Sequence, residues 1–516
     1  MATQAPQVVL VIGQTGSGKS ELVDEVARGL DEGGWMEVVT LRYHAPAEYD
    51  DGYRGAVQQI LNPWNDTREE AEARLARWLA RDHQRPIGSV AGEAAALTRW
   101  CGYLGDDEVP VNAAVGLTFL YRHLDARAWR GGACLVLEDV HSARVEGDGL
   151  AICEALLERS VGERPVVVMA TISEEALSED ARLAARVAAL EERGAIRIKA
   201  SRLSLEPMVS LLVEGLRLAP RLARALAPAC SGSPTYAMLW VRDRATRGEF
   251  VLGPDGRFVL RDGLVLSELM PDSLQALCAW RVQGALAATE DPPAVAEALL
   301  ATALAGPEPP VQVVRQINLD GLDALVATGL VRQRGTRLVF EQEGIRRAAL
   351  ELVAGRAARA ALHRRLAEAW QELGRTTGAD VNLPVGQHCL AADEPGAALV
   401  PLLRACRTAL REGRAGLALE VADQAGAAAE RTEVSMARVE AIQRRAEALM
   451  ALERPAAARV ALQQAHRAAH MDRRTKARLQ LIGAEVATAE GELVEARRLL
   501  EMAATTFEAT RDRRGM

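Results

Sequence analysis

Residues 8–20 read Val-Val-Leu-Val-Ile-Gly-Gln-Thr-Gly-Ser-Gly-Lys-Ser, and this stretch decides the fold. Its apolar first part predicts a buried β-strand, and the remainder has the spacing G-x-x-x-x-G-K-S. A strand that runs into such a loop and then into a helix is the context in which this pattern predicts a phosphate-binding loop. We therefore expect the chain to bind a nucleoside triphosphate.

The lysine of this loop is informative because Lys19 is one of three lysines among 62 basic residues. A compact ammonium on a flexible stem can reach the β- and γ-phosphates, whereas a planar guanidinium is broader. The Ser20 hydroxyl can bind Mg²⁺, so the expected cofactors are ATP or ADP with Mg²⁺. The expected nucleotide-binding residues of the loop are Gly13, Gln14, Thr15, Gly16, Ser17, Gly18, Lys19 and Ser20.

A second motif is Cys134-Leu-Val-Leu-Glu138-Asp139, an apolar strand that ends in two acids. This is the pattern of a Walker B element, in which one carboxylate holds Mg²⁺ and its neighbour polarises the attacking water. By position we assign the metal role to Glu138 and the water role to Asp139, although the order reverses the commoner Asp-Glu. Two solvated acids at a strand end are the alternative interpretation.

A third motif is the apolar run Val166–Thr171. In sheets of this kind the corresponding strand lies beside the loop strand, so Thr171 is a candidate sensor of the γ-phosphate. A buried strand that merely ends in a turn is an equally good explanation.

Composition bounds the remaining possibilities. The net charge of −8 offers no general basic field for nucleic acid or anionic lipid, so we expect neither as a partner. The seven cysteines are scattered without a C-x-x-C pair, which favours reduced, buried thiols. With no signal peptide and no apolar span of membrane length, we expect a cytoplasmic protein.

Four segments follow from the pattern along the chain. Residues 1–200 alternate strands and helices around a helical insertion at about 50–130, which predicts an α/β P-loop NTPase domain with a parallel sheet. The helix after the loop should bury Leu22, Val26 and Leu30. The expected strands are Val8–Ile12, Val38–Arg42, Cys134–Glu138, Val166–Thr171 and Ile196–Lys199.

The later segments are mainly helical. Residues 201–265 predict a helical lid with a small hairpin around Pro254-Asp-Gly256, and residues 266–355 a winged-helix-like domain. Its signature is a helix over Leu319–Thr328 followed by β runs at Leu330–Arg334 and Arg337–Phe340. Residues 356–516 predict helical pairs that resemble degenerate tetratricopeptide repeats, with an unpatterned helical bundle as the alternative.

Together the loop, Leu137-Glu-Asp-Val-His141, Ala170-Thr-Ile-Ser173 and Gly232-Ser-Pro234 resemble the STAND class of signal-transduction ATPases. The likeness is to the AAA-like ATPase modules of large bacterial serine/threonine kinases and of maltose-regulator-type activators. These have a P-loop domain, a lid, a winged helix and helical repeats in this order. The resemblance implies that Gly232 and Pro234 lie in the lid near the nucleotide.

Three positions depart from the family pattern. Ser173 stands where an arginine often follows the sensor strand, Ser142 where a tryptophan often follows the Walker B histidine, and Gln342 where a histidine is usual. Since arginine stabilises transition-state charge, the first departure affects hydrolysis more than binding. We therefore expect a weak ATPase.

The resemblance implies a nucleotide-gated signalling switch that hydrolyses ATP slowly and binds proteins through its repeats. Nucleotide-dependent homo-oligomers and a separately encoded effector are further expectations, since the chain carries no kinase motif. Two alternatives stay open. One is an interaction scaffold with a structural nucleotide, and the other is a DNA-binding regulator that uses the winged helix, to which Arg332, Arg334 and Arg337 lend positive charge.

Overall fold

The computed structural model describes residues 7–43, 52–60, 67–101, 113–128, 132–142, 149–158, 165–352, 356–411, 414–466 and 473–510. The chain divides into two compact units. The first comprises Met1–Gln59, Leu120–Ala143 and Asp148–Val353, and the second Ile60–Phe119, Arg144–Gly147 and Ala354–Met516.

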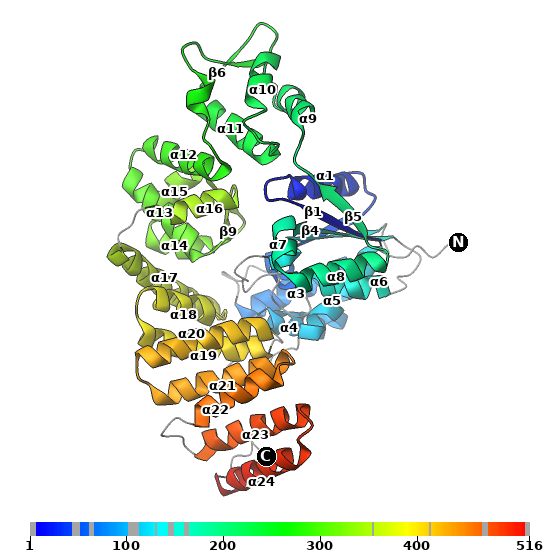
Figure 1. The fold of residues 1–516 in the computed structure, drawn as a ribbon, viewed down its shortest axis with the longest axis vertical. Coiled ribbons are helices and arrows are strands. Elements are labelled where there is room, and N and C mark those ends of the chain that lie inside the picture. Colours follow the sequence, from blue (N-terminus) through cyan, green and yellow to red (C-terminus); the bar gives the residue numbers. More distant parts are fainter. Residues whose placement is uncertain are drawn as a thin grey trace, which may run out of the picture. The chain divides into compact units, whose positions relative to one another are not determined.

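A parallel sheet forms the centre of the first unit (Figure 1). Its order is β2-β3-β4-β1-β5, and all neighbouring strands are parallel. The sheet thus confirms the predicted α/β P-loop fold, with each expected strand in place. The strands are β1 (Gln7–Gly13), β2 (Glu37–Arg42), β3 (Ala133–Glu138), β4 (Val166–Ser173) and β5 (Ile196–Ala200).

Helix α1 (Lys19–Glu32) packs on one face of this sheet with side chains other than those predicted. Val23 and Ala27 are buried against the sheet together with the partly buried Leu30, whereas Leu22 is 44% exposed and Val26 is 45% exposed. A constant spacing of four drifts around a helix of 3.6 residues per turn, but steps of four and then three stay on one side. The predicted burial of Leu22 and Val26 was therefore wrong.

The described residues of the insertion between β2 and β3 are mainly helical, as predicted. It contains α2 (Tyr53–Ile60), α3 (Arg68–Asp82), α4 (Ile87–Trp100) and α5 (Ala113–Ala128). After β3 come α6 (Gly149–Glu158), α7 (Glu174–Glu179) and α8 (Ala181–Glu192). Helix α7 begins directly at the end of β4, because the Ser173 hydroxyl accepts a hydrogen bond from the Ala176 N–H and caps the helix.

The predicted lid is a helical segment with a hairpin. It contains α9 (Leu205–Ser210), a π-helical turn (Leu211–Gly215), α10 (Pro220–Leu226), α11 (Pro234–Thr246), β6 (Phe250–Leu252) and β7 (Phe258–Leu260). The hairpin pairs Phe250 with Leu260, as expected for a turn at Pro254-Asp-Gly256. Trp240 of α11 is fully buried, and its indole N–H donates to the Leu269 carbonyl.

The segment expected to resemble a winged helix contains helices and one hairpin. Its helices are α12 (Leu274–Ala287), α13 (Pro292–Ala305), α14 (Val311–Ile317), α15 (Leu319–Ala327) and α16 (Glu343–Leu350). The hairpin comprises β8 (Val331–Arg334) and β9 (Arg337–Phe340), which are antiparallel. The predicted helix and both β runs are thus present.

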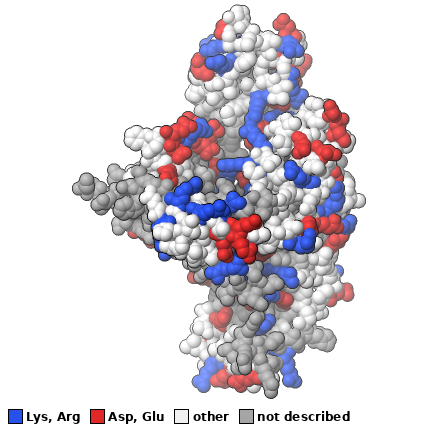
Figure 2. Space-filling view, turned by 180° about the vertical axis from the view of Figure 1, so that it is seen from behind, with Lys and Arg blue, Asp and Glu red and all other residues white. Residues whose placement is uncertain are grey.

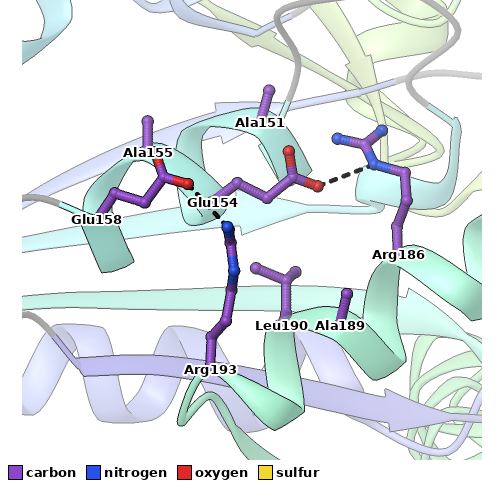
Figure 3. A pocket seen from close by; sticks show the side chains of 8 residues that line it. All are labelled: Ala151, Glu154, Ala155, Glu158, Arg186, Ala189, Leu190 and Arg193. Atoms are coloured by element: carbon purple, nitrogen blue, oxygen red, sulfur yellow. Dashed lines mark hydrogen bonds and ion pairs between the residues drawn. The ribbon is translucent and has the colours of Figure 1, made fainter.

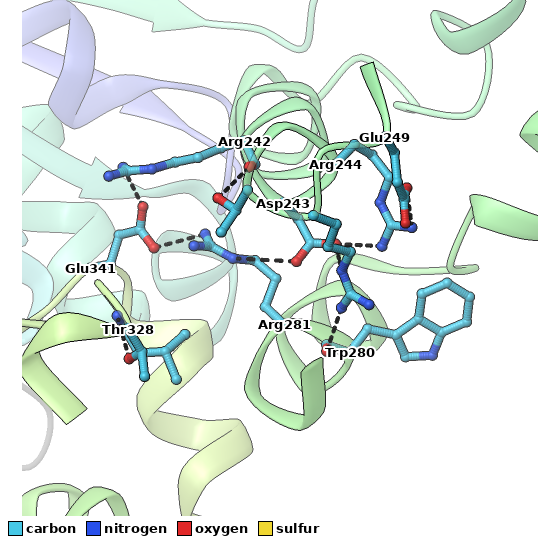
Figure 4. Close-up of polar contacts among 11 residues, drawn as sticks. Arg242, Asp243, Arg244, Glu249, Trp280, Arg281, Thr328 and Glu341 are labelled. Carbon is cyan, nitrogen blue, oxygen red and sulfur yellow. Dashed lines mark hydrogen bonds and ion pairs between the residues drawn. The ribbon is translucent and has the colours of Figure 1, made fainter. Parts of the chain in front are cut away.

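A buried ionic cluster joins α11, α12 and the end of β9 (Figure 4). Arg281 Nη1 lies 2.7 Å from Glu341 Oε2, and Arg281 Nε lies 4.0 Å from Asp243 Oδ1. Arg244 also pairs with Asp243, and exposed Arg242 pairs with Glu341. Because buried charges require partners, this cluster ties the lid helix to the hairpin segment.

Helices of the second unit pack as successive neighbours from residue 356 onward. They are α17 (Arg356–Thr377), α18 (Asn382–Ala391), α19 (Pro395–Arg411), α20 (Ala415–Arg431), α21 (Ser435–Ala451), α22 (Pro455–His466), α23 (Arg473–Ala489) and α24 (Leu493–Thr510). Alanines 446, 458, 461 and 465 form much of one shared core, which allows the helices to approach closely. Among the described residues no helix is long and apolar enough to cross a membrane.

All seven cysteines are buried thiols and none forms a disulfide bond, as the scattered spacing predicted. The prediction of four separate domains is a finer division than the two compact units, and its boundaries remain predictions.

Candidate functional site

The phosphate loop connects β1 to α1 and needs its glycines. Gly16 has a φ of +77° and Gly18 a φ of +90°, the left-handed region that side chains disfavour. A Cβ on Gly13 would lie 2.2 Å from the Ala200 carbonyl oxygen, so this position also excludes a side chain. The conformation of the loop therefore requires glycine at these three positions.

Lys19 lies inside the loop and is 8% exposed. Its Nζ donates to the carbonyl oxygens of Gly13, at 2.9 Å, and Gln14, at 3.0 Å. Burial lowers the pKa of Lys19, and the negative charges of Asp139, Glu175 and Glu174 oppose this shift. The ammonium is thus held at the loop by neutral carbonyls, and the charges of three acids act on it.

The loop has donors to offer an anion. Within the described part of the chain, no protein acceptor meets the backbone N–H groups of Gly16, Gly18, Lys19 and Ser20. The Ser17 hydroxyl is buried and likewise has no partner there. Free N–H groups at the start of a helix fit a phosphate, and exposed Ser20 can add a hydroxyl ligand for Mg²⁺. The residues present therefore fit a Mg²⁺-nucleotide.

Glu138 ends β3 and is already paired. Arg42, at the end of neighbouring β2, places Nε 2.7 Å from Glu138 Oε2. The Nη1 atom of Arg42 lies 3.1 Å from Glu308 Oε1, and Glu308 belongs to the segment between α13 and α14. Burial raises the pKa of Glu138, and the Arg42 charge opposes this effect. Arg42 therefore links the predicted metal carboxylate to a residue of the helical segment.

Asp139 follows in a left-handed conformation, with a φ of +54°. Its N–H donates to the Thr171 hydroxyl at 2.8 Å, and its Oδ1 lies 3.9 Å from His141 Nδ1. Thr171 is fully buried, so its hydroxyl holds the turn after β3. Burial lowers the pKa of His141, which Asp139 opposes. The charge of Asp139 thus acts on Lys19, whereas Glu138 is paired with Arg42.

The segment predicted to be a lid contacts the loop directly. Ser233 caps α11 and donates from its hydroxyl to the Gly16 carbonyl at 3.0 Å. A Cβ built on Gly18 would lie 3.7 Å from Pro234 Cγ. Gly232 has a φ of +73°, and a Cβ there would lie 2.6 Å from the Leu203 carbonyl oxygen. The Gly-Ser-Pro segment is thus positioned against the loop.

Contacts on other sides of the loop come from residues that no sequence motif singled out. Arg202 Nε donates to Gln14 Oε1 at 2.9 Å. Glu175 Oε1 accepts from the Thr15 N–H at 3.2 Å. Of these two, Glu175 had a local signal, since an acid in the first turn of a helix is favoured by the helix dipole.

The structure therefore brings the loop, Asp139 and the lid residues Gly232 and Pro234 together, with Thr171 behind them and Glu138 turned toward Arg42. Sequence reasoning missed Arg42, Glu175, Arg202, Ser233 and Glu308. Ser233-Pro234 could have been recognised as a helix start, because serine before proline is a common N-cap. Glu308 carried no signal. The metal and water roles of Glu138 and Asp139 remain predictions.

A shallow pocket of about 450 Å³ lies between α6 and α8, away from the loop (Figure 3). Glu154 pairs with Arg186, and Glu158 with Arg193, across it. Because its charged side chains satisfy one another and none of its lining residues belongs to the loop, we do not place the nucleotide there.

No protein-family model and no curated protein sequence matches the chain. Among solved structures, the chain is similar to a STAND protein with a tetratricopeptide repeat sensor from Pyrococcus horikoshii, at 13% identity and a TM-score of 0.48. The match covers 99% of this chain and 63% of that protein, so the chain spans less than two thirds of its length.

Two other similar structures are those of an ORC2 protein and of CDC6P. The ORC2 protein of Aeropyrum pernix, in ADPNP–ADP complexes, is 13% identical, with a TM-score of 0.30. The match covers 72% of this chain and 89% of the ORC2 chain. CDC6P of Pyrobaculum aerophilum has 11% identity, coverages of 71% and 89%, and a TM-score of 0.29. Likenesses at this level concern the fold alone.

Proposed function

We propose that this chain is a STAND-type signalling ATPase, a cytoplasmic switch in which bound ADP or ATP with Mg²⁺ controls protein–protein interaction through tetratricopeptide-like helices. In the ADP state the lid and the winged-helix-like segment rest on the loop. ATP releases them and exposes a surface for assembly with a second copy or a separately encoded effector.

The observation that carries this proposal is that both segments touch the nucleotide site. Ser233 of the lid holds the Gly16 carbonyl, and Arg42 bridges Glu138 to Glu308. A nucleotide that changes the loop or recruits Glu138 to Mg²⁺ must therefore alter contacts of the lid and the helical segment. A coupling of this kind needs only a differential affinity for the two arrangements.

Hydrolysis in this proposal is slow and resets the switch. Asp139 is the candidate for orienting the attacking water, because its charge acts on Lys19 while Glu138 is held by Arg42. Ser173, the last residue of β4, stands where an arginine would stabilise transition-state charge.

The test is nucleotide binding by the full chain, measured by calorimetry for wild type and for Lys19→Ala. We expect Lys19→Ala to weaken ATP binding by at least about tenfold, since it removes the ammonium that reaches the phosphates. Lys476→Ala, an exposed lysine on α23, is the matched control and should bind as wild type does. Equal affinity in Lys19→Ala and wild type would contradict the proposal.

A scaffold with a structural nucleotide is the second candidate, favoured by the stacked helices of the second unit. Turnover separates it from the switch. If wild type releases phosphate no faster than Asp139→Asn, and both bind partner proteins equally with and without nucleotide, the chain is a scaffold.

DNA binding through the hairpin β8–β9 is less well supported. Arg332 and Arg334 are exposed, but Arg337 is buried and donates to the Glu308 carbonyl. On the face drawn in Figure 2, basic and acidic side chains alternate in small groups. A salt titration with duplex DNA tests this function, which requires affinity that falls steeply with salt.

A further inference from the structure

Glu175 holds an unusual position for an acid at a phosphate loop. The register of the sheet sets Ser173 of β4 beside Gly13 of β1, so the start of α7 lies next to the start of the loop. From there Glu175 Oε1 accepts the Thr15 N–H at 3.2 Å across 160 residues of sequence. Its Oε2 accepts the Ser173 hydroxyl at 2.6 Å.

Its neighbour Glu174 shows that this contact is not a general property of the helix start. Glu174 Oε1 lies 3.2 Å from Lys199 Nζ of β5, and no contact joins it to the loop within the described residues. Both acids lie in the first turn of α7, where the helix dipole favours them. Only Glu175 also takes a donor from the loop.

The charge of Glu175 acts where phosphates would bind. Asp139, Glu175 and Glu174 all act electrostatically on Lys19, the residue whose ammonium reaches β- and γ-phosphates in loops of this pattern. Of the two acids in the first turn of α7, only Glu175 adds to this a hydrogen bond from the loop. Burial acts to raise the pKa of Glu175. The hydrogen bonds from Ser173 and Thr15 outweigh this effect and hold that pKa below its usual range. The carboxylate is therefore ionised at neutral pH.

We propose that Glu175 is a specificity-determining residue that makes the site favour a nucleoside diphosphate over a triphosphate. A γ-phosphate brings negative charge toward an end of the loop where Glu175 already occupies the Thr15 N–H. Two like charges repel, and the donor is unavailable to the phosphate. A diphosphate uses the N–H groups nearer the helix and avoids most of this repulsion. The inference rests on the proposed nucleotide binding.

The experiment compares the dissociation constants of ADP and of a non-hydrolysable ATP analogue, with Mg²⁺, by calorimetry on the full chain. Glu175→Gln keeps the size and removes the charge. We expect it to shift the affinity ratio toward the triphosphate by about tenfold, mainly through tighter analogue binding. Glu175→Ala removes the hydrogen bond as well and should shift the ratio in the same direction.

Two controls separate the contact from general charge. Glu174→Gln removes a neighbouring charge without a loop contact, and Glu179→Gln an exposed charge farther along α7. We expect these to change the ratio by less than about twofold, because within the described residues neither side chain accepts a donor of the loop, and solvent and salt screen the charges of side chains at the surface. Circular dichroism and melting of each variant establish that it is folded.

The outcomes are distinct. If Glu175→Gln changes both affinities equally or neither, Glu175 only shapes the loop and the inference is overturned. If Glu174→Gln shifts the ratio as much as Glu175→Gln, the Thr15 contact is not responsible and the inference also fails. If wild type binds neither nucleotide, both the inference about Glu175 and the proposed function fail. If both nucleotides bind but Glu175→Gln leaves the affinity ratio unchanged, only the inference about Glu175 fails.

Discussion

Gly16 is the residue at which the phosphate loop and the lid constrain each other. Its φ of +77° disfavours a side chain, and a Cβ there would lie 3.2 Å from the Ser233 hydroxyl. The same hydroxyl donates to the Gly16 carbonyl. One residue thus combines a backbone requirement of the loop with a packing requirement of the lid.

We predict that Gly16→Ala destabilises the chain by about 1–3 kcal/mol, as a non-glycine residue in a disfavoured backbone region does, and weakens nucleotide binding. Gly29→Ala is the control. Gly29 lies within α1 with no atom within 4 Å of an added Cβ, so alanine there should raise the melting temperature slightly. Thermal melting and calorimetry measure both effects. A Gly16→Ala protein as stable as Gly29→Ala would refute this account of the loop.

At the scale of elements, the ionic cluster between α11, α12 and β9 gives a contrast between buried and exposed charges. We predict that Arg281→Met costs about 1.5–3 kcal/mol, because Glu341 loses its buried partner and keeps only the exposed Arg242, while Asp243 keeps Arg244. Arg242→Met should cost at most about 1 kcal/mol, since Arg242 is 51% exposed although it pairs with the same Glu341. Urea unfolding of the two variants measures the difference, and similar midpoints would contradict the prediction.

A pair of histidines between α17 and α18 predicts acid sensitivity of the second unit. His388 and His363 face each other with Nδ1 atoms 3.0 Å apart, so one ring must be neutral to accept. Burial, with the neighbouring His363, lowers the pKa of His388 from 6.5 to about 3. Below about pH 6.5 the unfolded chain therefore binds a proton that the folded chain does not.

The free energy of unfolding should accordingly fall as the pH falls through this window, by up to about 1.4 kcal/mol per pH unit. We expect wild type to lose melting temperature between about pH 7 and about pH 5, and His388→Gln to lose less over the same range. Melting curves across this range measure the slopes. Parallel slopes for the two proteins would show that His388 does not contribute.

At the scale of the molecule, the contact from Arg42 to Glu308 should bias the switch. We predict that Glu308→Gln, which weakens this link, makes a larger species form at lower concentrations of a non-hydrolysable ATP analogue than wild type requires. The reason is that the proposed release breaks this contact, so weakening it beforehand shifts the populations toward the released arrangement by about tenfold for each 1.4 kcal/mol lost. Size-exclusion chromatography with light scattering, in ADP and in the analogue, measures it.

Glu290→Gln is the control for this experiment, since Glu290 is an exposed acid near the end of α12. It should behave as wild type does in both nucleotides. If wild type keeps one size in ADP and in the analogue, the chain does not assemble in response to nucleotide, and the repeats act without such a switch.

Much of the fold could be predicted because its signals are local. The strand, loop and first helix lie within one stretch, and the other strands are short apolar runs. Burial within α1 could not be predicted by a spacing of four, because the choice between Leu22 and Val23 depends on how the helix is rotated against the sheet. Such a rotation is a tertiary property.

The sequence by itself determined that this chain has a phosphate loop, since the glycines, Lys19 and Ser20 form the site from consecutive backbone groups. Only the tertiary structure decided what surrounds that loop. Ser233 reaches Gly16 across 217 residues, and Glu308 reaches Arg42 across 266. Contacts of this kind arise from the packing of separate elements. The spacing of residues along the sequence does not predict such contacts.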